Sequence, residues 1–460
     1  MRNRFRCWIF YLTVAVILTG CATYYKKNLK LYQAIETGQF EAADKLLDKD
    51  TKSPTNRNSL LYYLNRGYVS WMLNDNRQSV DFFNTAERII DDHSFNIGAE
   101  ALSLVTNPMM KPYHAEDFEI VMVNCFKAIS FMQVENYEAA MVECRRINLK
   151  LNQLNDKYPN HKNRYQNDAF AHTMMGLLYD SNGDYNNAFI AYRNAFNAYE
   201  NDYAPNFNVQ PPQQLKMDIL RTAYMVGFRE ELDFYERKFD MKYTHAAKSE
   251  AEMIFFWMNG FGPVKDEWSV NFTIVKGAGG VVTFVNEEMD LSFPFPSVSS
   301  SEGDAFSNLK LVRAAFPKYV ERKPVSVSAV ITSDAASYPL EPAQNINEIA
   351  FKTLNDRFMR EMASSLLRVA AKQALEGVAR KEDNGLGTVL SIVNAATEKA
   401  DTRNWQSLPY AISYARVPLT GGDNKLTLNV NMITGRTAAS DVSIEAQQGK
   451  TYFYAFHTLN

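Results

Sequence analysis

The chain has 460 residues, with 49 Lys and Arg against 52 Asp and Glu, and 46% of its residues are hydrophobic. At about 150 residues per domain, this length allows two or three domains with cores of their own, which excludes a disulfide-stapled miniprotein and a disordered chain. A formal net charge of −3 with both signs mixed along the chain gives no field strong enough to hold nucleic acid, so partners must be recognised through shape.

The first twenty-one residues have the pattern of a secretory signal. Arg2, Arg4 and Arg6 precede the apolar run Cys7–Leu18, which is too short to cross a bilayer of about 30 Å as a helix. The run ends in Leu18-Thr19-Gly20-Cys21, which resembles the lipobox of bacterial lipoproteins. The resemblance implies cleavage before Cys21 and acylation of its thiol with chains such as palmitate; the alternative is an uncleaved anchor with an incidental cysteine.

A chain lipidated at Cys21 would stay at a membrane, because two or three acyl chains make an effectively permanent anchor. Ala22 follows the cysteine at the position where the enteric sorting pattern has an Asp to retain a lipoprotein in the inner membrane. We therefore expect the outer membrane, on its periplasmic face.

Two cysteines remain in the mature chain, Cys125 and Cys144. In an oxidising compartment they are candidates for a disulfide. The alternative is that both are small buried side chains in adjacent helices. Sequence cannot choose between these, because a bridge needs Cα atoms within about 7 Å.

The stretch from Ala169 to Ala198 contains small and aromatic residues at spacings that match the tetratricopeptide (TPR) pattern: Gly176, Tyr179, Gly183-Asp184-Tyr185, Ala188, Tyr192 and Ala195. Small residues let two antiparallel helices approach closely, and the tyrosines fill the space around them. Similar sets recur around Gly67, Ala128, Gly38 and Gly227. The sequence thus predicts five helical hairpins in a TPR-like domain over residues 22–250.

The inner face of each first helix in such an array is where TPR proteins bind peptides. Here that face would carry mostly apolar residues: Leu64, Tyr68, Trp71, Met122, Ile129, Met132, Phe170, Thr173 and Leu177. An apolar groove suits a segment of another protein. The carboxy-terminal part of the same chain is the alternative occupant, and the sequence does not decide between them.

Beyond Ala251 the pattern changes to the period-two alternation of strands. We predict strands over 268–275, 281–285, 325–332, 410–417, 425–433 and 450–456. The glycines at 277–280 are interpreted as a turn because their spacing fits no phosphate-binding loop.

Apolar residues spaced by four predict a long helix from Ile346 to Ala370. Gly385 and Gly387 would end it before a second helix, Thr388–Ala400. The fold class is therefore α+β: a TPR-like solenoid followed by a β-sandwich-like domain (251–460) that carries a helical hairpin at about 345–400.

Four short segments carry a wider resemblance: Asn259–Lys265, Ala400–Pro409, Ala415–Leu419 and Gly449-Lys450-Thr451. Together with the preceding repeats, they resemble an uncharacterised family of bacterial envelope lipoproteins with a TPR region and a β-rich carboxy-terminal domain. Members of that family are often encoded beside lipoprotein activators of penicillin-binding proteins. The resemblance implies a role near cell-wall synthesis and no assigned activity.

No catalytic or metal-binding motif stands out. The six histidines form no HExxH or Cys-His cluster and there is no Gly-x-Ser-x-Gly elbow, so we expect no metal, no cofactor and no enzyme activity. Asp401, Arg403 and Trp405 form a possible recognition patch for a carboxylate or sugar. The alternative is that Asp401 and Arg403 cap the second helix while Trp405 packs into the sheet.

Two functions follow from these observations. In the first, the chain is a lipid-anchored periplasmic adaptor that binds another envelope protein through the repeats. In the second, the carboxy-terminal domain binds or processes a glycan. The sequence determines neither the partner nor the oligomeric state.

Overall fold

Stacked pairs of antiparallel helices make up the first half of the chain. The computed structural model describes residues 24–95, 108–156, 164–245, 249–276, 281–296, 311–333, 336–382 and 399–459. The signal segment with Cys21 lies outside these residues. After the short helix α2 (Tyr24–Lys27) come five pairs: α3 (Leu29–Glu36) with α4 (Phe40–Lys49), α5 (Ser59–Met72) with α6 (Asn76–Phe95), α7 (Asp117–Gln133) with α8 (Tyr137–Asn155), α9 (Ala169–Ser181) with α10 (Tyr185–Ala198), and α12 (Gln213–Val226) with α13 (Arg229–Phe239).

Close helix contact depends on the small residues that the repeat pattern singled out. A Cβ atom added to Gly67 on α5 would lie 2.6 Å from the Phe83 ring on α6, and one added to Gly176 on α9 would overlap the ring of Tyr192 on α10. Gly183, in the turn between α9 and α10, has a φ of 74°, which favours glycine. The predicted TPR-like array is thus confirmed. Its connections include short helical turns, at η1 (Ser53–Thr55), η4 (Pro108–Met110), a π-helical turn η6 (Tyr199–Tyr203) and α11 (Ala204–Phe207).

The second half forms three four-stranded sheets. The inner sheet has the order β12 (Thr451–Thr458), β1 (Ala251–Asn259), β9 (Ala411–Leu419), β8 (Glu341–Asn345). The outer sheet has the order β11 (Thr437–Ala446), β10 (Gly422–Met432), β6 (Ser326–Thr332), β7 (Ser337–Pro339). The arm sheet has the order β4 (Leu291–Pro296), β3 (Val281–Asn286), β2 (Val264–Lys276), β5 (Leu311–Val320). β1 and β12 pair in parallel, and the other pairs are antiparallel.

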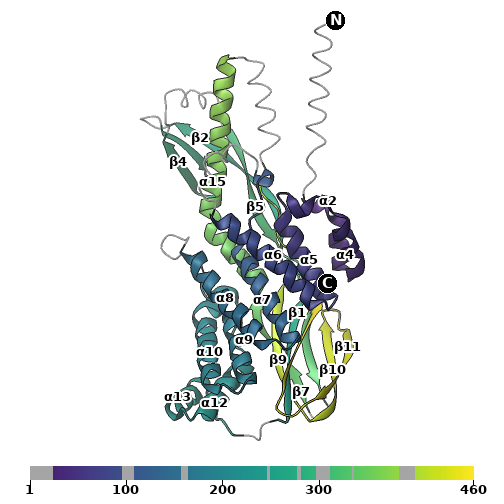
Figure 1. Cartoon of the computed structure of the whole chain (residues 1–460). Helices are drawn as coiled ribbons and strands as arrows, with labels where there is room; N and C mark the ends of the chain where they lie inside the picture. The colour runs from purple at the N-terminus through teal and green to yellow at the C-terminus, as the bar shows by residue number, and fades with distance from the viewer. Residues whose placement is uncertain are drawn as a thin grey trace.

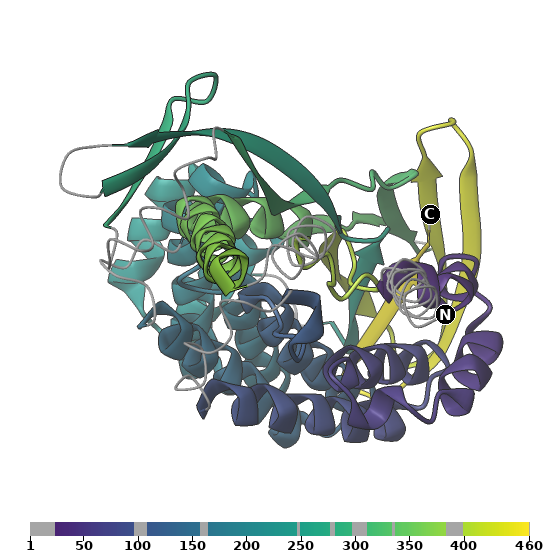
Figure 2. The same cartoon turned by 90° about the horizontal axis from the view of Figure 1, so that it is seen from above.

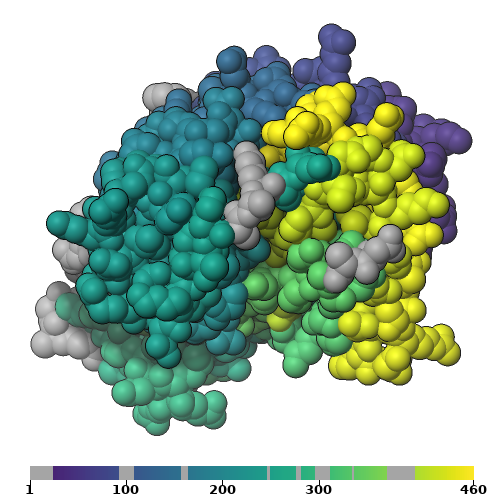
Figure 3. Space-filling view, turned by 90° about the horizontal axis from the view of Figure 1, so that it is seen from below, coloured from purple at the N-terminus to yellow at the C-terminus, as the bar shows by residue number. Residues whose placement is uncertain are grey.

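The helices, the inner sheet and the outer sheet lie in successive layers (Figures 1 and 2). One face of β1 (Ile254, Phe256 and Met258) packs into the same hydrophobic core as the helices. The other face (Met253, Phe255 and Trp257) packs against the outer sheet, as a sandwich does. Seen from below in Figure 3, the strands (green to yellow) lie directly against the helices (blue to teal). The helical array and the inner sheet therefore share one core.

The helix predicted from Ile346 is α15 (Ile346–Glu382), longer than expected. Its residues Met362, Leu366 and Val369 pack on the arm sheet and form a separate core with Phe272 and Phe316. The predicted second helix falls on residues outside the described ranges, except for Lys399 and Ala400, which are not helical.

The six predicted strands are all present, and six others were not predicted: β1, β4, β5, β7, β8 and β11. β1 was missed because it is buried on both faces, so its sequence is continuously apolar rather than alternating. β11 was missed for the opposite reason. It is mostly exposed and polar, and gives little hydrophobic signal.

Candidate functional site

The predicted groove residues lie on α5, α7 and α9, on the side of each helix that faces the sheets. All of them are buried, from Tyr68 at 0% exposure to Trp71 at 5%. Ile254 and Phe256 of β1 and Phe453 of β12 belong to the same core cluster. The expectation of an open partner-binding groove is therefore wrong. The chain's own inner sheet fills it, because that sheet has a second apolar face to bury.

Several specific contacts hold the inner sheet in this groove. The Phe170 ring on α9 meets the Phe256 ring on β1 edge to face, with centroids 5.6 Å apart. The Tyr137 hydroxyl on α8 donates to the Thr451 carbonyl at 2.7 Å, at the start of β12. Gln133 donates to the Ala455 carbonyl at 3.5 Å and accepts from the Trp71 indole at 3.0 Å. The helices thus cover the outer edge of β12 as well as the face of the sheet.

Asp401, Arg403 and Trp405 form an internal bridge. Trp405 is 1% exposed and packs against both Phe83 and Phe126, with centroid distances of 5.7 and 5.6 Å. It packs on helices rather than into the sheet, so no face of its ring is open to a sugar. The proposal of an exposed recognition patch that includes Trp405 is wrong.

The Arg403 guanidinium is also fully engaged within the chain. Its Nη2 donates to Asp401 Oδ2 at 2.5 Å and to the Lys111 carbonyl at 3.1 Å, and its Nη1 donates to Asn58 Oδ1 at 3.0 Å. Asp401 and Arg403 are thus brought together as expected, but they tie the segment before β9 to the helical array.

Cys125 on α7 and Cys144 on α8 are both buried free cysteines. The structure therefore contains the alternative to the disulfide: two small side chains in adjacent helices. Burial raises the pKa of both thiols, so both stay protonated at neutral pH.

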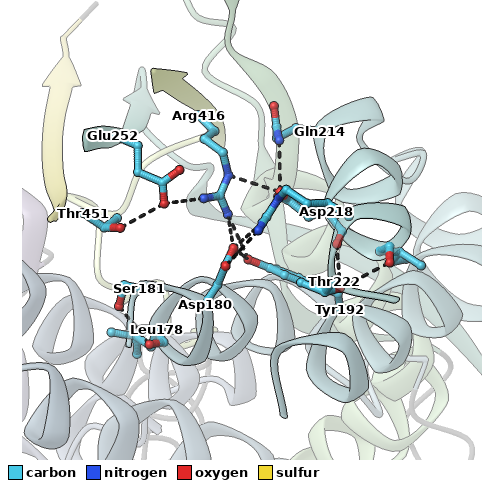
Figure 4. A network of polar contacts seen from close by, with 12 residues as sticks. Leu178, Asp180, Ser181, Tyr192, Gln214, Asp218, Thr222, Glu252, Arg416 and Thr451 are labelled. Atoms are coloured by element: carbon cyan, nitrogen blue, oxygen red, sulfur yellow. Dashed lines mark hydrogen bonds and ion pairs between the residues drawn. The ribbon is translucent and has the colours of Figure 1, made fainter. Parts of the chain in front are cut away.

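A buried ionic network joins the last repeats to the sheets (Figure 4). Arg416 of β9 contacts Asp180 of α9 at 2.8 Å, Asp218 of α12 at 3.2 Å and Glu252 of β1 at 2.6 Å. Arg221 of α12 also pairs with both aspartates. Burial opposes ionisation of Asp180, but Arg416 and Arg221 outweigh it and lower its pKa to about 2. For Asp218, burial prevails and the pKa is raised.

Sequence reasoning did not select this network. The available signal was Arg416 itself, the single charged residue in the predicted strand 410–417. Such a residue in a buried strand needs an anionic partner. The sequence gave no sign that its partners would come from α9 and α12.

A second charged cluster joins α7, β2 and α15. Glu116, at the start of α7, pairs with Lys265 of β2 and Arg357 of α15. Burial disfavours the Glu116 carboxylate, but Arg357 and Lys265 overcome it and lower its pKa to about 2. Glu119 accepts from the backbone N–H of Trp405 at 2.7 Å and contacts the Tyr113 hydroxyl. Burial and the neighbouring Glu116 raise the Glu119 pKa to about 7.

Two cavities flank the Asp401–Arg403 ion pair. The larger, of about 630 Å³, lies beside α2 and is lined by Tyr24, Lys27, Asp50, Lys52, Arg57 and Arg403, among others. The smaller, of about 200 Å³, is lined by the Glu116, Lys265 and Arg357 cluster and by Asp401. Within the described ranges, no three His, Cys, Asp or Glu side chains converge in a way that could hold a metal ion.

The outer sheet ends in an open edge. β11 is ten residues long, and seven of them are exposed: Thr437–Asp441, Ser443 and Glu445. Among the described strands, β11 pairs only with β10. It contains neither Pro nor Lys, which natural edge strands use against unwanted pairing. β4, at the edge of the arm sheet, carries Pro294 and Pro296.

An exposed apolar patch lies at one end of this outer sheet. Ile433, in the turn between β10 and β11, is 73% exposed, and Val327 on β6 is 58% exposed. The Ile433 N–H donates to the Val325 carbonyl at 2.8 Å, which places the turn beside the start of β6. Open backbone groups and exposed apolar side chains thus occur together on the outer sheet.

No protein-family model matches the chain, and no curated protein matches it. Among solved structures, it is similar to the crystal structure of MamA (16% identity, 47% of this chain, 93% of that chain, TM-score 0.28). It is also similar to the apo form of RapI (14%, 47%, 68%, TM-score 0.33) and to BtubC from P. vanneervenii (13%, 54%, 91%, TM-score 0.32). Likeness at this level carries no information about function. Among the described helices, none is long and apolar enough to cross a bilayer.

Proposed function

We propose that this chain is a lipid-anchored, non-catalytic adaptor on the periplasmic face of a bacterial outer membrane, working near cell-wall synthesis. Acylation at Cys21 would provide the anchor, and the lipobox-like Leu18–Cys21 segment supports it. The partner is another envelope protein. It does not bind in the repeat groove, because the inner sheet occupies that groove.

The observation that carries the adaptor role is the open edge of β11. An extended segment of a partner can add a strand there, with main-chain hydrogen bonds supplying affinity and side-chain contacts supplying specificity. The other long edges in the described sheets are less available: helices cover β12, and β5 carries Pro317 and packs against α15. Ile433 and Val327 offer the partner an apolar contact on the same sheet.

Paired proline substitutions test this edge. In an edge strand, neighbouring N–H groups point alternately to the paired strand and outward. Of Ala438→Pro and Ala439→Pro, one should break the ladder to β10 and lower the melting temperature. The other should leave the fold stable and abolish partner binding.

A photoreactive residue at Ser443, in the full chain in living cells of the source bacterium, should crosslink to one defined envelope protein. The photoreactive residue placed instead at Tyr224, which is exposed on α12, serves as the control. Loss of the Ser443 crosslink in the stable proline variant would support binding of the partner at the β11 edge. An unchanged crosslink in that variant, or equal crosslinking from both positions, would contradict the proposal.

A further inference from the structure

The larger cavity has the size of a ligand site and lies at the beginning of the described chain. Its volume of about 630 Å³ falls within the range of roughly 300–1,000 Å³ typical of small-molecule pockets. Its walls come from α2 and from the loop between α4 and α5, with Arg403 behind them. Tyr24 in this wall is itself buried. Nothing in the adaptor role uses this cavity.

Positive charge dominates the lining. Lys27, Lys52 and Arg57 have exposed side chains, and none of the three makes an ion pair in the described part of the chain. The single carboxylate in the lining is Asp50, whose charge interacts with that of the neighbouring Lys52. Its Oδ1 already accepts the backbone N–H groups of Lys52 at 3.1 Å and Ser53 at 3.0 Å. The cations therefore exceed the anions by three to one around the open space.

The charge of Arg403 does not add to this excess, because Asp401 neutralises it at 2.5 Å. The contribution of Arg403 is indirect. It donates to the amide oxygen of Asn58 at 3.0 Å, which fixes the orientation of that side chain.

Two of the three asparagine amides in the wall are left as donors, whereas the third, Asn28, donates its NH₂ group to the Tyr24 carbonyl at 3.0 Å. The Asn58 amide oxygen is occupied by Arg403, and the Asn56 amide oxygen accepts the Asn58 backbone N–H at 2.7 Å. With both oxygens engaged, the NH₂ groups of Asn56 and Asn58 are what these side chains can offer a ligand. Three cations and two amide donors make a wall suited to an oxyanion.

We propose that this cavity binds a phosphate group, either as a free phosphate anion or as a phospholipid headgroup. Lysine and arginine with neutral N–H donors match the several acceptor oxygens of a phosphate. The headgroup source rests on the proposed acylation of Cys21. Tyr24 is three residues from that cysteine, so the chain can place the cavity no more than about 11 Å from the anchor. The free-phosphate source does not depend on the anchor.

Lysine footprinting on the purified full chain in detergent tests the free anion. Acylation rates of individual lysines are measured by mass spectrometry in sodium phosphate and in sodium chloride of equal ionic strength. We expect phosphate to slow acylation of Lys27 and Lys52 by three-fold or more. Lys30, exposed on the neighbouring α3 but outside the cavity, should be unaffected.

A second arm tests the headgroup, with the full chain in vesicles of phosphatidylcholine alone or mixed with phosphatidylglycerol, without free phosphate. Protection of Lys27 and Lys52 in either kind of vesicle, relative to the sodium chloride sample in detergent, that spares Lys30 assigns the site to a headgroup, because both lipids carry a phosphate group. Protection in the phosphate arm alone assigns it to a free anion. Equal protection of Lys30, or no protection in either arm, overturns the proposal.

Substitutions separate the cavity from general surface charge. Arg57→Ala should reduce the protection of Lys27 and Lys52 at least three-fold, whereas Lys30→Ala should leave it unchanged. Both residues are exposed, so an unaltered melting temperature will show that the fold is retained. Equal effects of the two substitutions would also overturn the proposal. A failure here would leave the adaptor role intact, because the β11 crosslink reports on a different surface.

Discussion

The hydroxyl of Tyr68 on α5 lies 2.8 Å from Nδ1 of His457 on β12, a contact between residues 389 positions apart. His457 Nε2 lies 2.6 Å from the Gly260 carbonyl, which can only accept. Nε2 therefore carries the proton of the neutral ring, and Nδ1 accepts from Tyr68. This contact joins one of the first repeats to the last strand of the chain.

Tyr68→Phe should destabilise the folded chain by about 1–2 kcal/mol, because it leaves the buried Nδ1 of His457 without a donor. Chemical denaturation measures the change. Tyr25→Phe is the matched control, since Tyr25 is exposed on α2 and should change stability by less than about 0.5 kcal/mol. Equal effects of the two substitutions would mean that the contact does not hold the halves together.

Acid should weaken this contact. Burial lowers the pKa of His457 from 6.5 to about 4. A base whose folded-state pKa is depressed contributes stability above its unfolded pKa, and that stability is lost as the pH falls from about 6.5 through 4. The melting temperature of the wild type should fall over this window more steeply than that of His457→Phe. If the melting temperatures of the wild type and of His457→Phe fell in parallel with pH, His457 would not titrate as its burial predicts.

The effect of Glu119→Gln on the free energy of unfolding should be more favourable at pH 8 than at pH 5, by about 1–3 kcal/mol. Burial raises the Glu119 pKa to about 7, so the stability linked to its proton is full below 4.5 and lost as the pH rises through 7. A glutamine cannot lose that proton. Denaturation at the two pH values measures the difference.

Glu116→Gln is the control for this cluster and should act in the opposite direction. The substitution leaves Lys265 and Arg357 without their carboxylate, so it should destabilise the chain at both pH values. If the effect of Glu119→Gln on stability were the same at pH 5 and pH 8, the assignment of a raised pKa to Glu119 would be wrong.

Arg416→Met should destabilise the chain by about 3–5 kcal/mol at neutral pH, because it leaves Asp180, Asp218 and Glu252 around a buried space without their shared cation. Arg229→Met, on the exposed start of α13, is the control and should have little effect. Thermal unfolding compares the two. A small loss at Arg416 would mean that hydrophobic contacts alone hold the last repeats on the inner sheet.

The helical half was predictable from sequence because its determinants are local. Gly67 and Gly176 each meet an aromatic residue 16 positions later, so spacing along the chain records the packing. The strands with alternating residues were predictable for the same reason. The apolar inner faces at Leu64, Tyr68 and Phe170 were also identified, since burial requires only that something apolar cover them.

What covers those faces was decided by the tertiary structure. An apolar stripe carries no information about which other apolar surface will meet it, because the hydrophobic effect is not directional. β1 has two buried faces, and only the assembled sheets show that one packs on the outer sheet and the other on the repeats. The same assembly buries Trp405 and gathers Asp180, Asp218 and Glu252 around Arg416 from strands and helices far apart in the sequence. The cationic cavity and the open edge of β11 are likewise products of the assembled chain, since each depends on which neighbours are near and which are absent among the described residues.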